Sequence, residues 1–198
     1  MTRTGLIIGL LLAWMCAAVA SARPTIVIDA GHGGHDRGGM PGVRYAEKVY
    51  ALDVSRRVAA RLRSAGFRTV MTRNGDYFVS LSGRCAVANR LRNAVFVSVH
   101  FNAAERRGAD GIETYYYGGR AYGLAAAVHR RMVAAAGTEN RGVRRRGYYV
   151  LRHTDCPAIL VEGGFLTNPR EGARIANSAA HRQRLADAIA GGIIATYR

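Results

Sequence analysis

Three short apolar runs, each rich in β-branched residues, set the main limit on how this chain can fold. They cover residues 25–30, 94–99 and 157–161, and they are typical of buried strands. Weaker runs predict further strands at residues 67–72, 112–117 and 148–151. Helical patterns separate most of these runs. We therefore expect an α/β fold with a mostly parallel or mixed twisted sheet of about six strands and helices on both faces.

The expected helices are marked by apolar side chains that recur every four residues. The stretch 46–65 carries the clearest stripe, formed by Tyr50, Val54, Val58 and Leu62. Further helices are expected at residues 80–92 and 121–136, after Pro169 and after Ser178. Gly191 and Gly192 should loosen the last turns of the final helix.

The chain length suits one domain. Its 198 residues are enough for a sizeable core, and no internal repeat or low-complexity tract divides them. Hydrophobic residues make up 49% and charged residues 21% of the chain, which excludes wholesale disorder.

Residues 1–22 have the three parts of a secretory signal peptide. Arg3 supplies the positive start, residues 5–20 form an uncharged apolar run, and Ala20-Ser21-Ala22 forms a cleavage site of small residues. The run is shorter than the roughly 20 residues that a membrane-spanning helix needs. We expect cleavage to leave residues 23–198 as one exported domain, periplasmic or in the cell wall or extracellular space, without a stable membrane span.

The charge balance predicts an anionic partner. The chain has 29 Lys and Arg against 13 Asp and Glu, a formal net charge of +16. Export makes nucleic acid an improbable partner and favours anionic polymers of the cell wall, bound through the basic surface. Residues 141–146 hold four arginines, and we expect them to form either a solvated loop or a ligand-binding segment.

Two cysteines, Cys85 and Cys156, remain after the signal peptide. In an oxidising compartment they can pair as a disulfide. They can equally be buried thiols, because cysteine packs well as a small apolar residue. Sequence spacing does not decide between the two.

Four polar residues stand where one edge of the sheet can gather them. His32, His100 and Glu162 each end or follow a predicted strand, and Glu47 lies in the first turn of a predicted helix. The helix dipole alone can explain an acidic residue such as Glu47 there. Two histidines and one carboxylate are the ligand set of a catalytic zinc site, and a second carboxylate beside it can transfer protons. Spacing alone leaves Glu47 and Glu162 exchangeable between these roles.

These four residues belong to longer motifs that together resemble a known family. The motifs are IVIDAGHGG at 26–34, EK at 47–48, TR at 72–73, Arg84 with Ala88-Asn89, SVHFNA at 98–103 and PAILVEGGF at 157–165. In this order they resemble the zinc-dependent N-acetylmuramoyl-L-alanine amidases of the type-3 class, over residues 25–197.

The resemblance implies a role for each of the four residues. His32, Glu47 and His100 would bind one zinc ion per chain, and Glu162 would be the catalytic glutamate. The implied substrate is peptidoglycan, cleaved at the amide between N-acetylmuramic acid and the L-alanine of the stem peptide. Residues 23–198 would form the catalytic domain.

Two devices found in some family members are missing from the sequence. It shows no wall-binding repeats, so we expect the basic surface to take over adsorption. The 62 residues from His100 to Glu162 (162 − 100) are filled by predicted strands and a helix, which leaves no room for an inserted inhibitory helix. We therefore expect a site that is open without an activator. Separately, we expect the chain to act as a monomer.

Three other functions fit part of the pattern. A non-catalytic wall-binding protein would have no need of Glu162. A zinc peptidase would cut inside the stem peptide, and an iron oxygenase would use the same two-histidine, one-carboxylate set. Released fragments, metal content and dependence on oxygen distinguish these from an amidase.

Overall fold

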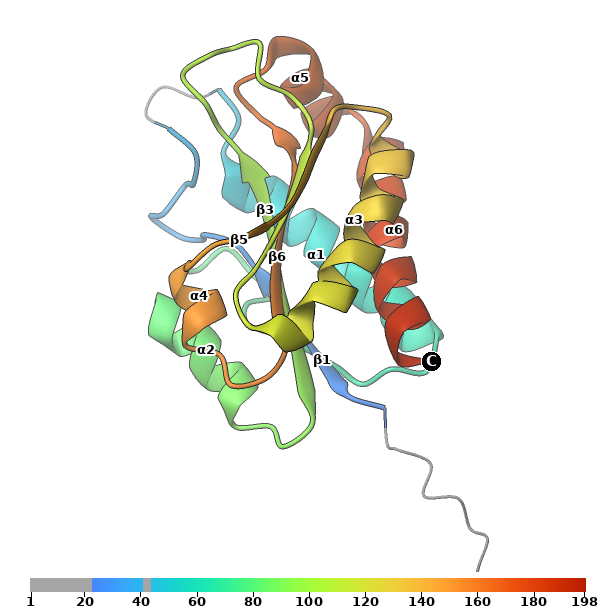
Figure 1. The fold of residues 1–198 in the computed structure, drawn as a ribbon. Helices are drawn as coiled ribbons and strands as arrows, with labels where there is room; N and C mark the ends of the chain where they lie inside the picture. Colours follow the sequence, from blue (N-terminus) through green and yellow to red (C-terminus); the bar gives the residue numbers. More distant parts are fainter. Residues whose placement is uncertain (1–22, 41–43) are drawn as a thin grey trace, which may run out of the picture.

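A six-stranded mixed sheet in the order β2-β1-β3-β6-β4-β5 forms the centre of the protein (Figure 1). The computed structural model describes residues 23–40 and 44–198, so the predicted signal peptide at residues 1–22 lies outside the described residues. The strands are β1 (Thr25–Ala30), β2 (Thr69–Met71), β3 (Ala94–Asn102), β4 (Ile112–Tyr116), β5 (Asn140–Arg145) and β6 (Ala158–Phe165). Strands β2, β1, β3 and β6 are parallel, β4 is antiparallel to β6, and β5 is parallel to β4.

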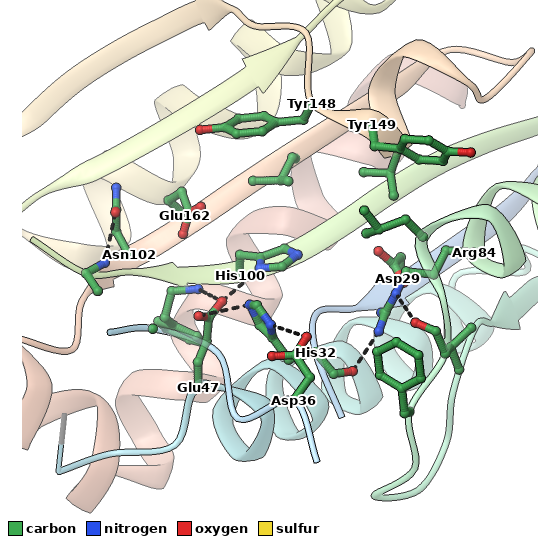
Figure 2. Close-up of a pocket in the computed structure, with 18 residues that line it drawn as sticks. Asp29, His32, Asp36, Glu47, Arg84, His100, Asn102, Tyr148, Tyr149 and Glu162 are labelled. Carbon is green, nitrogen blue, oxygen red and sulfur yellow. Dashed lines mark hydrogen bonds and ion pairs between the residues drawn. The ribbon is translucent and has the colours of Figure 1, made fainter. Parts of the chain in front are cut away.

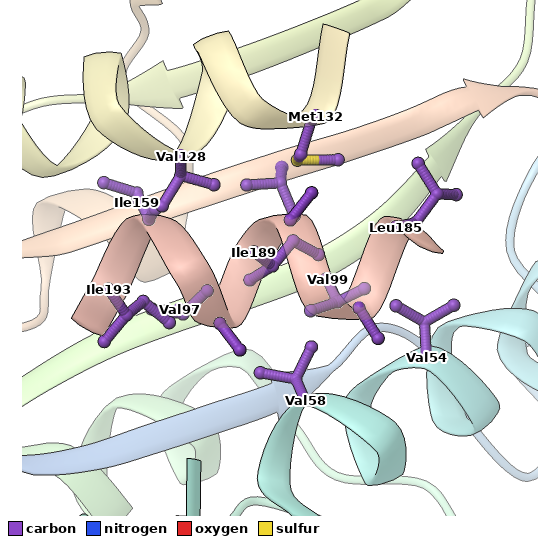
Figure 3. Close-up of a cluster of buried hydrophobic side chains, with 14 of the residues drawn as sticks. Val54, Val58, Val97, Val99, Val128, Met132, Ile159, Leu185, Ile189 and Ile193 are labelled. Atoms are coloured by element: carbon purple, nitrogen blue, oxygen red, sulfur yellow. The ribbon is translucent and has the colours of Figure 1, made fainter. Parts of the chain in front are cut away.

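Helices cover both faces of this sheet, which confirms the expected α/β architecture. The helices are α1 (Glu47–Ser64), α2 (Leu81–Asn89), α3 (Tyr122–Ala136), α4 (Tyr149–Arg152), α5 (Pro169–Asn177) and α6 (Ala179–Tyr197), with a 3₁₀ turn η1 (Gly119–Ala121) before α3. Helices α1, α3 and α6 pack on one face, with α6 between the other two (Figure 3). Helices α2 and α4 pack on part of the opposite face.

None of the helices that the structure describes is both long and apolar enough to cross a membrane.

The central strand β3 explains why one face is left for chemistry. Alternate side chains of a strand point to opposite faces. Val95, Val97 and Val99 are buried in the core beneath α1, α3 and α6 (Figure 3). The alternate residues Ser98 and His100 therefore point to the opposite face, where α2 and α4 leave the carboxyl ends of the strands uncovered.

The paired glycines near the end of α6 do not loosen that helix, contrary to the sequence prediction. The helix continues to Tyr197. A Cβ atom at Gly192 would lie 2.6 Å from the Cα of Val128 on α3, so the missing side chain lets the two helices approach closely. Close packing against α3 outweighs the low helix propensity of glycine.

We expect Gly192→Ala to lower the free energy of unfolding by about 1–3 kcal/mol, because the added methyl group must push α3 and α6 apart. Gly191→Ala is the matched control, since the nearest heavy atom to its Cβ would be the Cδ of Arg131 at 3.6 Å. There the gain in helix propensity should leave stability equal or higher. Urea unfolding measures both variants, and equal stabilities would contradict close packing as the role of Gly192.

Residues 141–151 differ most from the sequence prediction. The arginine-rich residues, expected to form a solvated loop or a ligand-binding segment, lie mostly in the edge strand β5, whose backbone pairs with β4. An edge strand accepts charged side chains because one of its sides faces solvent. The expected strand at 148–151 is instead the one-turn helix α4, which turns the chain back over the sheet and buries Val150 and Leu151.

Both cysteines are thiols in the structure, which selects one of the two alternatives left by the sequence. Cys85 on α2 is buried, and Cys156 packs against the same apolar cluster. Burial raises the pKa of the Cys156 thiol to about 11, so this thiol is protonated at neutral pH.

Candidate active site

Three of the predicted site residues meet at the carboxyl ends of β1 and β3 (Figure 2). His32 follows β1, His100 lies on β3, and Glu47 is the first residue of α1. One side-chain ligand atom from each lies within 4.8 Å of the others. Glu162 on β6 is the direct cross-strand neighbour of His100. Both His100 and Glu162 lie inside their strands, which continue further than the sequence pattern predicted.

Glu47 connects the two histidines. Its Oε2 lies 3.1 Å from Nε2 of His32, and its Oε1 lies 2.8 Å from Nδ1 of His100. The backbone N–H of Phe101 also donates to Oε1, at 3.0 Å. Burial by itself raises the pKa of Glu47, but hydrogen bonds and charge attraction from His100 and His32 outweigh it and lower that pKa to about 2. Glu47 is therefore a buried carboxylate anion.

His32 is oriented by a carboxylate that sequence reasoning did not single out. Its Nδ1 lies 2.8 Å from Oδ2 of Asp36, which also accepts a hydrogen bond from the backbone N–H of Gly38 through Oδ1. Burial lowers the pKa of His32, but Glu47 and Asp36 outweigh it and raise that pKa overall. A carboxylate on one ring nitrogen leaves the other to face the cluster, as is usual for metal-binding histidines. The spacing of four residues from His32 was the available signal.

Glycines make the space in which these side chains meet. A Cβ atom at Gly31 would lie 2.4 Å from Cε1 of His100, inside the imidazole ring's contact distance. A Cβ atom at Gly38 would lie 2.5 Å from Cδ2 of His32 and 2.6 Å from Oε2 of Glu47. Gly38 also has a φ of 70°, which favours glycine. Any side chain at either position would displace the cluster.

Two buried arginines hold the backbone that carries His32. Arg73 donates to the carbonyl oxygen of Gly31 at 2.7 Å, and Arg84 donates to that of His32 at 2.8 Å. Arg84 also pairs with the buried Asp29 at 2.8 Å. These contacts restrain His32 in a left-handed conformation with a φ of 60°. The motifs contained all three charged residues, but their supporting role could not be inferred from spacing.

Glu162 differs from Glu47 in having almost nothing to hold it. Its Oε2 is buried and has no hydrogen-bond partner among the described residues. Burial, followed by the charges of Glu47 and Glu113, holds the pKa of Glu162 well above its ordinary value. A dication beside Glu47 would reverse part of this shift, because positive charge favours the carboxylate form.

Glu113 on β4 is the other cross-strand neighbour of Glu162, and sequence reasoning missed it. It accepts hydrogen bonds from the amide of Asn102 at 2.8 Å and from the hydroxyl of Tyr115, and it pairs with Nε of Arg141 at 3.0 Å. All its partners are protein groups, so Glu113 has a supporting position. The signal for it was its place in a strand, on the same face as Tyr115.

These residues lie at the base of a cavity of about 600 Å³. Phe78 and Leu81 are among the residues that line it. Tyr148, which precedes α4, and Tyr149, the first residue of α4, also line it (Figure 2). The one-turn helix α4 therefore borders the cavity. That the site is open without an activator stays a prediction. His35 packs against the ring of Phe78, with 4.4 Å between ring centroids.

The donor set suits zinc. Two imidazoles and one carboxylate with their ligand atoms close together match a catalytic zinc site with one position left for water or substrate. The buried Oε2 of Glu162 beside them has no partner among the described residues, which lowers the stability of the fold. Since buried polar atoms normally have partners, this exception indicates a function. The arrangement can bind a metal ion and place a proton acceptor next to it.

Comparison with known proteins identifies relatives of this chain. N-acetylmuramoyl-L-alanine amidase LytC of Bacillus subtilis is 34% identical over 178 residues, which cover 88% of this chain and 36% of LytC. The chain thus spans about a third of that relative's length. The catalytic domain of CwlV, an N-acetylmuramoyl-L-alanine amidase from Bacillus (Paenibacillus) polymyxa, superposes with a TM-score of 0.83 at 34% identity, over 88% of this chain and 99% of that one.

A second solved structure, the N-acetylmuramoyl-L-alanine amidase AmiC2 of Nostoc punctiforme, gives a TM-score of 0.81 at 40% identity, over 87% of this chain and 96% of AmiC2. The family model described as N-acetylmuramoyl-L-alanine amidase (Amidase_3) matches residues 26–195, which is nearly all of the part that the structure describes. The resemblance drawn from the sequence motifs is confirmed, and the chain belongs to the type-3 N-acetylmuramoyl-L-alanine amidase family.

Proposed function

We propose that this chain is a zinc-dependent hydrolase that cleaves peptidoglycan at the amide between N-acetylmuramic acid and the L-alanine of the stem peptide. One observation carries the proposal most strongly. The carboxyl group of Glu162, whose buried Oε2 has no partner among the described residues, lies next to the cluster of His32, Glu47 and His100 at the base of an open cavity. Family membership supports the choice of substrate.

His32, Glu47 and His100 would hold one zinc ion. When bound, zinc polarises a substrate carbonyl and lowers the pKa of a coordinated water to about 7. Asp36 keeps the ring of His32 oriented through the 2.8 Å contact to Nδ1. The N–H of Phe101 keeps Glu47 oriented through its bond to Oε1. These two contacts prepare the ligand positions before the metal arrives.

Glu162 would act as the general base and then as the general acid. As a carboxylate it accepts a proton from the attacking water, and as a carboxylic acid it gives that proton to the departing alanine nitrogen. Its unpartnered oxygen suits both steps, because no hydrogen bond to a protein group must be broken first. Glu162 lies across from His100 and therefore beside the cluster of His32, Glu47 and His100.

The place of action and the partners follow from the substrate. We propose that residues 1–22 direct export and that residues 23–198 act as a monomer in the periplasm, the cell wall or the extracellular space. The net charge of +16 would attract anionic wall polymers, and this attraction should weaken as salt rises. Neither nucleic acid nor a stable membrane span has a part in this proposal.

Analysis of the products of purified peptidoglycan tests the proposal. We expect release of stem peptides with a free L-alanine amino terminus and glycan strands with intact N-acetylmuramic acid, identified by mass spectrometry. A chelator should stop the release, and zinc should restore it. A new amino terminus inside the stem peptide would show a peptidase, adsorption without release would show a binding protein, and a requirement for oxygen and iron would show an oxygenase.

A further inference from the structure

The face of the sheet that carries the candidate active site continues beyond Glu162 to the edge strand β5. In register, His100 lies opposite Glu162, and Glu162 lies opposite Glu113. Two residues along β4, Tyr115 lies opposite Arg144 of β5. Since residues two apart on a strand share a face, Arg144 projects from the same face as Glu113 and Glu162.

Arg144 reaches inward over this face and keeps an available guanidinium group. Its NH1 lies 3.7 Å from Oε1 of Glu113, although the side chain is 43% exposed. Its Nε donates to the carbonyl oxygen of Arg141 at 3.0 Å, which fixes the start of the guanidinium group. Among residues 23–40 and 44–198, neither of its terminal nitrogens has a hydrogen-bond acceptor.

The positive charge of Arg144 is in excess at this place. Glu113 is the acid nearest to Arg144, and Arg141 contacts it more closely, at 3.0 Å, while also pairing with Glu139 at 3.4 Å. The next residues along the chain are Arg145, which ends β5, and Arg146, which follows it; both add positive charge and are exposed. A ligand with a negative charge would therefore be attracted to the terminal nitrogens of Arg144.

We propose that Arg144 binds a carboxylate of the stem peptide on the departing-amine side of the scissile bond. This inference rests on the proposed function. If the substrate carbonyl is held at His32, Glu47 and His100 and Glu162 protonates the alanine nitrogen, the peptide beyond that nitrogen would run across β4 towards β5. Asn102 marks this path, because it lines the cavity and donates to Glu113.

The distance fits a carboxylate close to the cleaved bond. Arg144 lies two strand spacings from Glu162 and two residues further along the strands, which is roughly 12 Å at about 4.8 Å per strand and about 3.4 Å per residue. An extended peptide covers this distance in about three to four residues at roughly 3.3–3.6 Å each, and the Arg144 side chain reaches back towards Glu113. The side chain of an acidic residue in second or third position would bring its carboxylate within reach.

A carboxylate fits Arg144 better than a wall polymer does. A guanidinium group binds a carboxylate through two parallel hydrogen bonds, and the two terminal nitrogens of Arg144 have this geometry available. A polymer attracted by charge alone would bind equally well to Arg145. The guanidinium group of Arg145 lies 4.9 Å from the ring centroid of Tyr117. Arg145 lies opposite Tyr116, which packs against the core on the helix-covered face.

Binding of two synthetic muropeptides tests the proposal without cleavage. They differ only in whether the acidic residue after L-alanine carries a carboxylate or a carboxamide, and the protein is the zinc-loaded Glu162→Gln variant. We expect the carboxylate form to bind about tenfold more tightly at low salt. Adding Arg144→Gln should remove this preference, whereas adding Arg145→Gln, with the same loss of charge, should keep it.

The outcomes separate this inference from the proposed function. A missing preference, a preference that survives Arg144→Gln, or an equal loss in both arginine variants would overturn the carboxylate site. The carboxylate site would also be overturned if Arg144→Gln lost adsorption to a phosphate-containing wall polymer but kept the muropeptide preference. If the preference depends on Arg144 but wild-type protein leaves the bond between N-acetylmuramic acid and L-alanine intact, the carboxylate site stands and the proposed function fails.

Discussion

Glu162→Gln is expected to lower kcat on purified peptidoglycan by about 10²–10⁴-fold while the protein still binds one zinc ion. Glutamine has nearly the same shape, but it cannot accept a proton from water or give one to a leaving amine. Dye release from labelled peptidoglycan measures activity, and elemental analysis of dialysed protein measures zinc. Glu105→Gln removes an exposed carboxylate and should leave both values unchanged.

Stability distinguishes this loss from simple unfolding. Burial and the charges of Glu47 and Glu113 disfavour the ionised form of Glu162, so its pKa is raised in the folded protein. A raised carboxyl pKa costs stability at pH values above the ordinary value, where the unfolded state ionises freely. The metal-free Glu162→Gln variant should therefore unfold at the same or a higher temperature than the metal-free wild type. Turnover close to that of the wild type would rule out Glu162 as the proton carrier.

The fold could be predicted from sequence where the local pattern agrees with the tertiary environment. Strands β1, β3 and β6 are buried on both faces and carry the apolar β-branched runs typical of such strands. Strand β5 has the sequence NRGVRR, with no such pattern. It is a strand because β4 offers it an open edge, and edge pairing is a property of the assembled sheet.

The candidate site was predictable to the extent that its residue types are chemically distinctive. His32 and His100 stand out because they follow or end apolar runs. Asp36 and Glu113 do not, because a surface carboxylate and a supporting carboxylate look alike in sequence. Gly192 shows the same limit for the core, since its close approach to Val128 depends on a helix more than fifty residues away.

Spacing in the sequence also left the roles of two glutamates exchangeable, and their surroundings separate them. Glu47 has three partners: two imidazoles and a backbone N–H. Glu162 has a buried oxygen with none among the described residues. Groups with many fixed partners suit a ligand role, and an unpartnered group suits proton transfer. Replacing Glu47 is therefore expected to impair metal binding, whereas replacing Glu162 is expected to impair proton transfer.

Glu47→Gln is expected to lower zinc affinity by at least about 100-fold and to abolish hydrolysis at ordinary zinc concentrations. The amide keeps one oxygen but loses the negative charge, and its NH₂ group faces an imidazole nitrogen. The metal-free protein should also lose stability. The pKa of Glu47 is lowered from 4.5 to about 2, so its ionised form stabilises the fold above about pH 4.5, and this contribution is lost as the pH falls towards 2. Replacing it should cost on the order of 3 kcal/mol at neutral pH.

Zinc titration and urea unfolding of the two glutamine variants, side by side, decide which glutamate binds the metal. Glu47→Gln should lose both zinc affinity and metal-free stability, whereas Glu162→Gln should keep both and lose turnover. Since the two residues lie in one cavity and the substitutions are chemically identical, general disturbance of the site cannot produce this opposition. The reverse result, with zinc lost from Glu162→Gln and retained by Glu47→Gln, would exchange the two roles, because the carboxylate that the metal needs would then be the one that has no protein partner to orient it.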